Sequence, residues 1–466
     1  MKLFSGKRAR LLTLCGAVLL STSTYSSKTP DKSRFEKLEV FNKVLFLIES
    51  QYYREVDTEK LINGALKGMM GTLDPHSAFL DTEVFEKMQE DTKGEFGGLG
   101  IEVTLKDGVL IITTPIEDTP AFKAGLRSGD KIVEINHEST IGITLDEAVT
   151  RMRGKAKEKI SLGIVREGVE GIKTYELTRE IIKIQSVKNS LVDNHYGYVR
   201  LTQFQKDAGE DIIKAIKSLR KKAKDNSLRG LILDLRSNPG GLLDEAVNVS
   251  SIFLKDGVVV STEGRDPKNK DIRYVKKTGH KELELPLVVL INGSSASASE
   301  IVAGALQDHS RAIIMGTQSF GKGSVQTISK LGEDMGVKLT IAQYMTAKGR
   351  KIQAKGISPD VEISETEGDW IKENYKESSF IREADLKNHL NATIETKEEK
   401  AARLAREKSE RQERIERIKR MQEQKKKGKD GDALTAKKYD PDSDYQVQQA
   451  INYIRSFEVF KRMIKN

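Results

Sequence analysis

The spacing of hydrophobic residues changes along the chain, and each change predicts a different kind of structure. Apolar residues recur at helical intervals from Phe35 to Ile48, and a second helical set starts at Leu61, after Asp57 as an N-cap. The pattern predicts a helical hairpin that ends near residues 73–77. His76, within that ending, is expected to cap or pack rather than to catalyse.

Short β runs separated by glycine turns replace the helical pattern from Gly94 onward. The runs cover residues 98–103, 109–112 and 131–136, and a helical stretch follows at residues 145–152. This arrangement predicts a small β-rich domain inserted after the helices.

Apolar strands then alternate with loops and helices from Tyr198 onward. Strands are predicted at residues 198–201, 230–235, 287–291 and 312–315, and a helix at residues 242–254. Such alternation favours a mixed sheet covered by helices, with reactive groups on loops at the strand ends. Together the patterns predict an α+β multidomain protein with a helical N-terminal segment, an inserted β-rich domain, a mixed αβ core and a helical C-terminal extension.

Length and composition suit this plan. A chain of 466 residues suits two to four domains, and 37% hydrophobic beside 32% charged residues suits a soluble protein with a polar extension. Residues 397–429 are crowded with Glu, Lys and Arg, which predicts a solvated helix or a partly disordered tail. Despite a net charge of +9, alternating signs without interleaved aromatic residues argue against nucleic-acid binding. Peripheral contact with an anionic membrane or cell-wall polymer is expected instead.

Helical amphipathicity returns at residues 445–464, which are expected to pack on the core or on a second subunit. Because helical elements lie near both ends of the chain, a homodimer is the expected assembly.

The first 26 residues have the organisation of a secretory signal peptide. A basic start precedes apolar residues 11–20, about half the length that spans a bilayer, and small residues suited to cleavage follow. An uncleaved anchor is the alternative. The single cysteine, Cys15, follows Leu14, which is bulkier than a lipoprotein site usually accepts. The sequence thus predicts export to the periplasm or cell envelope.

Ser297 and Lys322 are the candidate nucleophile and base, and each lies in a loop rich in small residues. A serine hydroxyl needs a nearby base to take its proton, and a lysine serves only while its amine is neutral. Lowering a lysine pKa from about 10.4 by roughly 3 units costs on the order of 4 kcal/mol, which burial or a neighbouring cation must supply. The pair is compatible with a serine hydrolase that lacks a catalytic histidine.

Residue types alone leave other interpretations open. Residues 316–323 nearly spell a phosphate-binding P-loop, but Gly323 stands where Ser or Thr should ligate magnesium. Ser319 and Lys322 match the Ser-x-x-Lys of penicillin-binding enzymes, although the flanking glycines disfavour the helical turn it needs. His309 is the rival base, in a polar break typical of a solvated loop. The serine-rich run also suits a helix N-cap, which is compatible with a nucleophile because the helix dipole stabilises negative charge.

Residues 295–308 and 320–326 resemble the active-site signature of the bacterial carboxyl-terminal processing peptidases, also called tail-specific proteases. The resemblance extends from about Phe35 to Val361, with a weaker one near the C-terminus. It implies a serine endopeptidase that takes protein or peptide C-termini as substrate. It implies no cofactor, metal or nucleotide, and leaves an adaptor protein as a further class of partner.

The resemblance assigns roles to individual residues. It implies Ser297 as nucleophile, Lys322 as general base, Gln326 as the residue that orients the lysine, and an oxyanion hole built from the backbone of Ala298 and of Gly240 or Gly241.

The β-rich domain resembles a PDZ domain. Such domains take a peptide by strand addition and hold its terminal carboxylate with backbone amides. The substrate-binding residues implied are Gly98, Leu99, Gly100, Ile101 and Arg166. Arg166, on the expected closing strand, is either a solvated charge or a contact to the protease core.

The predicted layout is a signal peptide at residues 1–26, a helical segment at 27–92, a PDZ domain at 93–178, a Ser-Lys protease core at 179–365 and a charged helical extension at 366–466. The alternative from another class of function is a non-catalytic envelope PDZ scaffold that binds protein C-termini.

Overall fold

The computed structural model describes residues 32–106, 108–266, 268, 270–364, 382–386, 388–390 and 439–465. The chain divides into two compact units, Met1–Ala65 and Leu66–Asn466. The expected signal peptide and the charged run at 397–429 lie outside the described residues.

Helices α1 (Lys32–Gln51) and α2 (Thr58–Gly71) confirm the predicted helical character of the N-terminal segment. Asp57 accepts a hydrogen bond from the Lys60 N–H at 3.2 Å, as its predicted N-cap role requires. Among the helices of the described ranges, none combines the length and the hydropathy needed to cross a bilayer.

The inserted domain contains a six-stranded antiparallel sheet and two helices. Its elements are β3 (Ile101–Lys106), β4 (Val109–Pro115), α4 (Pro120–Lys123), β5 (Lys131–Ile135), β6 (Glu138–Ser139), α5 (Leu145–Met152), β7 (Lys159–Val165) and β8 (Lys173–Thr178). The domain has its own core, which includes Leu110, Ile132 and Leu162. Where the chain enters and leaves the domain, β2 (Glu95–Gly98) pairs with β9 (Glu180–Lys183).

The expected strand at 98–103 is interrupted after Gly98. Gly100 has a φ of +75°, and a Cβ there would stand 2.3 Å from the side chain of Thr119. This turn, which only glycine adopts without strain, separates β2 from β3.

The mixed αβ core is built on a second six-stranded sheet, in the order β10-β11-β12-β15-β16-β19. The strands are β10 (Val187–Val192), β11 (Tyr196–Leu201), β12 (Gly230–Asp234), β15 (Leu287–Ile291), β16 (Ile313–Gly316) and β19 (Val361–Glu362). Only the β10–β11 pair is antiparallel within this described sheet, so the predicted mixed sheet is confirmed.

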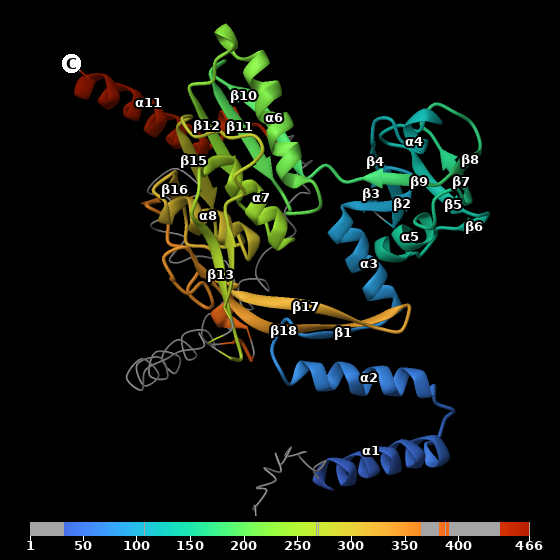
Figure 1. Ribbon diagram of the computed structural model, residues 1–466. Coiled ribbons are helices and arrows are strands. Elements are labelled where there is room, and N and C mark those ends of the chain that lie inside the picture. Colours follow the sequence, from blue (N-terminus) through green and yellow to red (C-terminus); the bar gives the residue numbers. More distant parts are fainter. Residues whose placement is uncertain are drawn as a thin grey trace, which may run out of the picture. The chain divides into compact units, whose positions relative to one another are not determined.

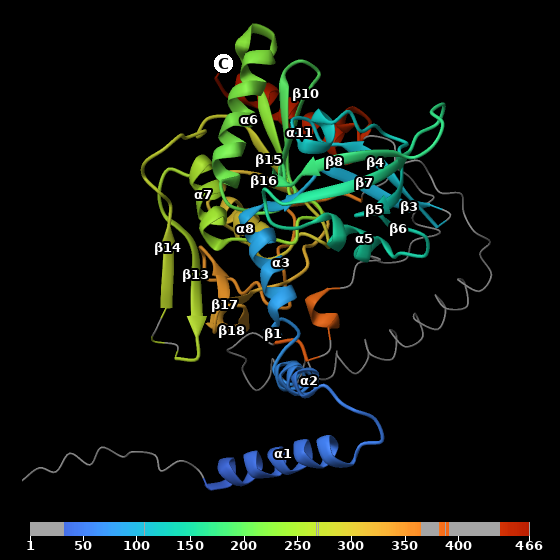
Figure 2. The same cartoon turned by 90° about the vertical axis from the view of Figure 1, so that its right-hand side faces the viewer.

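Helices cover both faces of this sheet. Since successive residues of a strand point to opposite faces, neighbouring residues pack against different helices. Leu231 and Leu233 belong to a core cluster that includes residues of α6 (Ala208–Lys222), α7 (Leu243–Phe253) and α8 (Ala298–Asp308). Figure 2 shows these three helices beside the sheet. Ile232 and Leu290 instead pack against α11 (Tyr445–Lys465). The C-terminal helix therefore packs on the core, as its amphipathic pattern predicts.

A third sheet was not predicted from the pattern. It joins β1 (Ala78–Leu80), β13 (Val258–Gly264), β14 (Lys270–Tyr274), β17 (Ser324–Leu331) and β18 (Met335–Thr346), and β17 and β18 form a long hairpin (Figure 1). Helix α3 (Thr82–Lys93) follows β1, and 3₁₀ turns lie at Lys224–Asn226, Glu383–Asp385 and Pro441–Ser443.

Candidate active site

Ser297 lies at the junction between a buried strand and a helix. β15 is wholly buried and ends at Ile291, and α8 begins at Ala298. The intervening loop is held by Ser295, whose Oγ accepts from the Asn292 N–H at 2.9 Å and donates to the Leu235 carbonyl at 2.8 Å. The junction places Ser297 at the positive end of a helix dipole.

The backbone of Ser297 is strained. Its φ of 54° and ψ of −112° lie in a region that residues other than glycine rarely adopt. Strain of this kind costs about 1 to 3 kcal/mol and persists where the surroundings enforce it, often at functional sites. Ser297 is partly exposed, whereas Ala296 and Ala298 beside it are buried.

Glu300 connects the loop that carries Ser297 (residues 292–297) to the loop that carries Lys322 (residues 317–323, called the lysine loop). Its side chain is fully buried. Oε2 accepts from the N–H groups of Ser297 at 2.8 Å and Lys322 at 2.9 Å. Oε1 accepts from the Gly321 N–H at 2.7 Å and the Ser319 hydroxyl at 2.5 Å. Burial raises the pKa of Glu300 to about 7, while these four hydrogen bonds favour its ionised form.

Lys322 is half-buried in the loop between β16 and β17, and Ser319, Gly321 and Gly323 of that loop are buried. Burial lowers the pKa of its amine, and the positive charge of Lys338 lowers it further. The negative charges of Glu383, Glu300 and Asp74 oppose this shift. A lowered pKa enlarges the neutral fraction that a general base requires.

The structure brings the backbones of Ser297 and Lys322 to one carboxylate, yet their side chains form no mutual hydrogen bond in the described residues. Catalytic hydrogen bonds often tighten only in the substrate complex.

The loop that carries Gly240 and Gly241 packs against Ser297. A Cβ on Gly240 would stand 2.8 Å from the Ser297 Cβ and 3.0 Å from the Ala298 nitrogen. The Gly240 N–H donates to Asn238 Oδ1 at 2.9 Å. In contrast, the N–H groups of Ala298 and Gly241 make no hydrogen bond within the described residues. These two amides are therefore available to donate hydrogen bonds to a ligand.

Gln326 lies on β17, close to a polar cluster. Its Nε2 donates to Ser324 Oγ at 2.8 Å and to Thr340 Oγ1 at 3.4 Å, and Thr340 donates to Asp74 Oδ1 at 3.1 Å. Within the described residues it forms no hydrogen bond with Lys322, so its orienting role stays a prediction.

The rival interpretations do not fit the structure. Residues 318–323 are not helical, and β17 follows Gly323 where a P-loop would open a helix. His309 lies at the C-terminal end of α8, about 18 Å from Ser297 along a helix that rises 1.5 Å per residue. Its Nε2 lies 2.8 Å from the Val258 carbonyl oxygen. Among the described residues, no group of three His, Cys, Asp or Glu side chains suits a metal ion.

The expected carboxylate clasp lies where β2 gives way to β3. Strand β2 ends at Gly98 and β3 begins at Ile101. Between them Leu99 is buried, and its carbonyl accepts a hydrogen bond from the Ala121 N–H at 3.0 Å. β3 is an edge strand with α5 beside it, which is the arrangement that strand addition requires. The geometry is compatible with the expected clasp.

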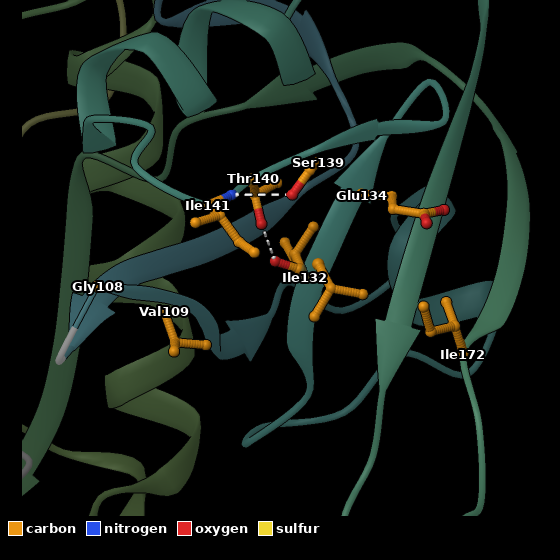
Figure 3. A pocket seen from close by; sticks show the side chains of 9 residues that line it. Gly108, Val109, Ile132, Glu134, Ser139, Thr140, Ile141 and Ile172 are labelled. Atoms are coloured by element: carbon orange, nitrogen blue, oxygen red, sulfur yellow. Dashed lines mark hydrogen bonds between the residues drawn. The ribbon is translucent and has the colours of Figure 1, made fainter.

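A separate pocket of about 240 Å³ opens between β4, β5 and β6 (Figure 3). Ile132, Ile141 and Ile172 line it, and the Thr140 hydroxyl donates to the Ile132 carbonyl at 2.7 Å. It contains none of residues 98–101, so it is distinct from the expected clasp.

Arg166 is engaged inside the PDZ domain. Its Nε and Nη2 donate to the two carboxylate oxygens of the buried Asp130, each at 2.7 Å, and Nη2 also reaches the Gly125 carbonyl at 2.9 Å. Although burial raises the pKa of Asp130, the hydrogen bonds and charge of Arg166 hold it below its ordinary value. Arg166 therefore closes the turn before β5 in this arrangement, and its contact with substrate or protease core stays a prediction.

Sequence reasoning missed Glu300 as a member of this site, and it missed the contact between His76 and Glu383. Glu300 stands three residues after Ser297, and that capping-box spacing was the available signal. His76 Nε2 lies 2.7 Å from Glu383 Oε2 across 307 residues of sequence, a separation for which no local pattern exists.

Comparison with known proteins agrees with this architecture. The model of peptidase family S41 matches residues 195–363, a PDZ domain model matches 88–165, and the N-terminal domain model of the activating protease CtpB matches 17–84. A solved structure described as a photosystem II D1 C-terminal processing protease is 30% identical and covers 71% of this chain and 87% of its own, at a TM-score of 0.42.

The sequence relatives are closer. The chain is 45% identical over 367 residues to a carboxy-terminal-processing protease of Bartonella bacilliformis, covering 78% of this chain and 83% of the relative. It is 38% identical over 337 residues to the carboxy-terminal processing protease CtpA of Bacillus subtilis, covering 72% and 70%. Identity at this level over most of both proteins shows common membership, so the chain belongs to the carboxy-terminal processing proteases, serine-type peptidases of family S41 that carry a PDZ domain.

Proposed function

We propose that this chain is an exported endopeptidase that cleaves proteins or peptides recognised through their C-terminus, with Ser297 as nucleophile and Lys322 as general base. The observation that carries the proposal is the buried carboxylate of Glu300, which accepts from the backbone N–H groups of both residues. A shared anchor of this kind holds two loops from different strands at one place.

The reaction follows from the chemistry of the two side chains. Neutral Lys322 takes the Ser297 proton as Oγ attacks the scissile carbonyl, and the amides of Ala298 and Gly241 stabilise the oxyanion. We assign Gly241 rather than Gly240 because the Gly240 N–H is already donated to Asn238. The protonated lysine then passes its proton to the leaving amine. Water, deprotonated by the same lysine, hydrolyses the acyl-enzyme and restores the serine.

The PDZ domain supplies substrate recognition in this proposal. A substrate C-terminus would add as a strand along β3, and the amides of residues 99–101 would bind its carboxylate. Export rests on the composition of residues 1–26 alone. Fractionation of cells and N-terminal sequencing of the recovered protein test it, and a cytosolic protein that keeps residue 1 would contradict it.

The decisive experiment incubates the full chain with an unfolded substrate that has an apolar C-terminus, and identifies fragments by mass spectrometry. Ser297→Ala and Lys322→Ala are each expected to lower kcat/KM by at least about 10⁴-fold with nearly unchanged thermal unfolding. Ser294→Ala, in the same loop, is the matched control. Amidation of the substrate terminus is expected to reduce cleavage. Wild-type turnover in Lys322→Ala would contradict the dyad, and binding without any fragments would favour a scaffold.

A further inference from the structure

The lysine loop is contacted by a segment that lies beyond the region matched by the peptidase family model, which ends at residue 363. This segment starts with a 3₁₀ turn at Glu383–Asp385, where Asp385 Oδ2 accepts from the Arg382 N–H at 3.0 Å. Arg382 Nη1 donates to Gln318 Oε1 at 2.8 Å, and the Glu383 N–H donates to the Phe320 carbonyl at 3.2 Å. Both contacts fall on the residues that lead into Lys322.

The side chain of Glu383 extends this contact to the other side of the lysine. The carboxylate is fully buried, and its Oε2 lies 2.7 Å from His76 Nε2. Its Oε1 accepts from Gln353 Nε2 at 2.9 Å, and Gln353 Oε1 accepts from the Gly323 N–H at 2.9 Å. A continuous chain of hydrogen bonds therefore runs from His76 to the residue next to Lys322.

The Gly323 end of this series of hydrogen bonds is tightly packed. A Cβ on Gly323 would stand 2.3 Å from the Gln353 nitrogen, so the two backbones are in close contact. The Gly323 carbonyl accepts from the Tyr344 N–H at 2.6 Å, and Gln353 Nε2 also donates to the Leu390 carbonyl at 2.9 Å. Because both ends of the Gln353 carboxamide are occupied, its orientation is fixed by Glu383 and the backbone around it.

We propose that Glu383, paired with His76, is a positioning residue for the lysine base, so that a segment of the C-terminal extension completes the active site of this protease. The inference rests on the proposed Ser-Lys dyad. It assigns a role to a residue outside the matched peptidase region and to a histidine that the sequence pattern marks only as a capping or packing residue.

The charge of Glu383 gives this role a signature that a merely structural residue lacks. Burial and Lys338 lower the pKa of Lys322, while Glu383, Glu300 and Asp74 raise it. Replacing the Glu383 carboxylate by an amide removes one of the charges that favour the ammonium form, so the pKa of Lys322 falls further. The amine then stays neutral to lower pH, and the acid limb of the kcat/KM profile moves toward lower pH.

The test compares Glu383→Gln and Glu383→Ala in the full chain with Glu284→Gln, which removes an exposed carboxylate. In Glu383→Gln we expect the acid limb to move down by about half a pH unit or more. In Glu383→Ala, which also releases Gln353, we expect kcat to fall by about 10- to 100-fold with little change in KM. The Glu284 variant is expected to match the wild type in both measurements.

An unmoved acid limb in Glu383→Gln, together with wild-type kcat in Glu383→Ala, overturns the positioning role. If Lys322→Ala is inactive in the same series, the dyad stands and only this inference fails. Active Lys322→Ala removes the dyad itself. If Glu383→Ala shows no cooperative thermal transition, His76→Ala is used instead, because it removes the imidazole that contacts Glu383. An undiminished kcat in His76→Ala overturns the proposal.

Discussion

Gly240→Ala tests how closely Ser297, the proposed nucleophile, is confined. The added Cβ would stand 2.8 Å from the Ser297 Cβ and 2.9 Å from the Ala296 carbonyl oxygen. Carbon atoms prefer separations of about 3.5 to 4.0 Å, so Ser297 has to move by about 1 Å. A displacement of that size at a reacting group costs about 100-fold in rate. The φ of +105° at Gly240 adds strain of about 1 to 2 kcal/mol to the folded state.

The assay measures kcat/KM with the unfolded substrate, beside the free energy of unfolding in urea. Gly279→Ala is the matched control, because Gly279 has a φ of +100° and no atom within 4 Å of its added Cβ. We expect both variants to lose comparable stability from backbone strain, and only Gly240→Ala to lose about 100-fold in kcat/KM. Equal catalytic rates in the two variants would show that the close approach of Gly240 to Ser297 does not govern the reaction.

Two further predictions concern the buried carboxylate of Glu300 and the half-buried carboxylate of Asp444. In Glu300→Gln the new NH₂ group replaces one oxygen, so two of the four groups that donate to Glu300 lose their acceptor. Because an unpaired buried donor costs about 1 to 3 kcal/mol, we expect a lower urea midpoint and lost turnover. Wild-type values for both would contradict the anchoring role. Asp444→Asn removes the charge that Arg236 contacts at 2.8 and 3.2 Å. Because Asp234 still pairs with Arg236, we expect a loss of about 1 to 2 kcal/mol, below the 3 to 5 kcal/mol of a fully broken buried pair. Burial raises the pKa of Asp444, but the hydrogen bonds and charge of Arg236 hold it below its ordinary value. The wild type therefore loses the stability that this pair contributes as the pH falls through that lowered pKa. The free energy of unfolding of Asp444→Asn should lack this pH dependence.

Much of the fold follows from local pattern. The predicted helix at 145–152 and the predicted strand at 287–291 have the bounds of α5 and β15. In α5 the Thr144 side chain accepts from the Glu147 N–H, and in β15 every residue is apolar and buried. Both signals are contained in a few consecutive residues, which is why the sequence alone reveals them.

The third sheet has no such signal within a few consecutive residues. All residues of β14 are exposed, and β18 pairs with β1, β13 and β17 along its length, so its burial pattern mixes several environments. Neither strand has a clean period of two. The site divides in the same way: Ser297 and Lys322 are indicated by small-residue loops, whereas the hydrogen bond between His76 and Glu383 exists only after distant segments meet.

A lysine base must satisfy two conditions that conflict. The amine has to be held in place, yet a carboxylate that pairs with it would raise its pKa and keep it charged. In the described residues the Lys322 amine forms no ion pair, and the nearby carboxylates act on the main chain instead, either directly or through another side chain. Glu300 accepts from the Lys322 N–H, and Glu383 acts through Gln353 on the Gly323 N–H. Position is thus fixed through the backbone on both sides of the residue, while burial remains the largest influence on the amine and lowers its pKa.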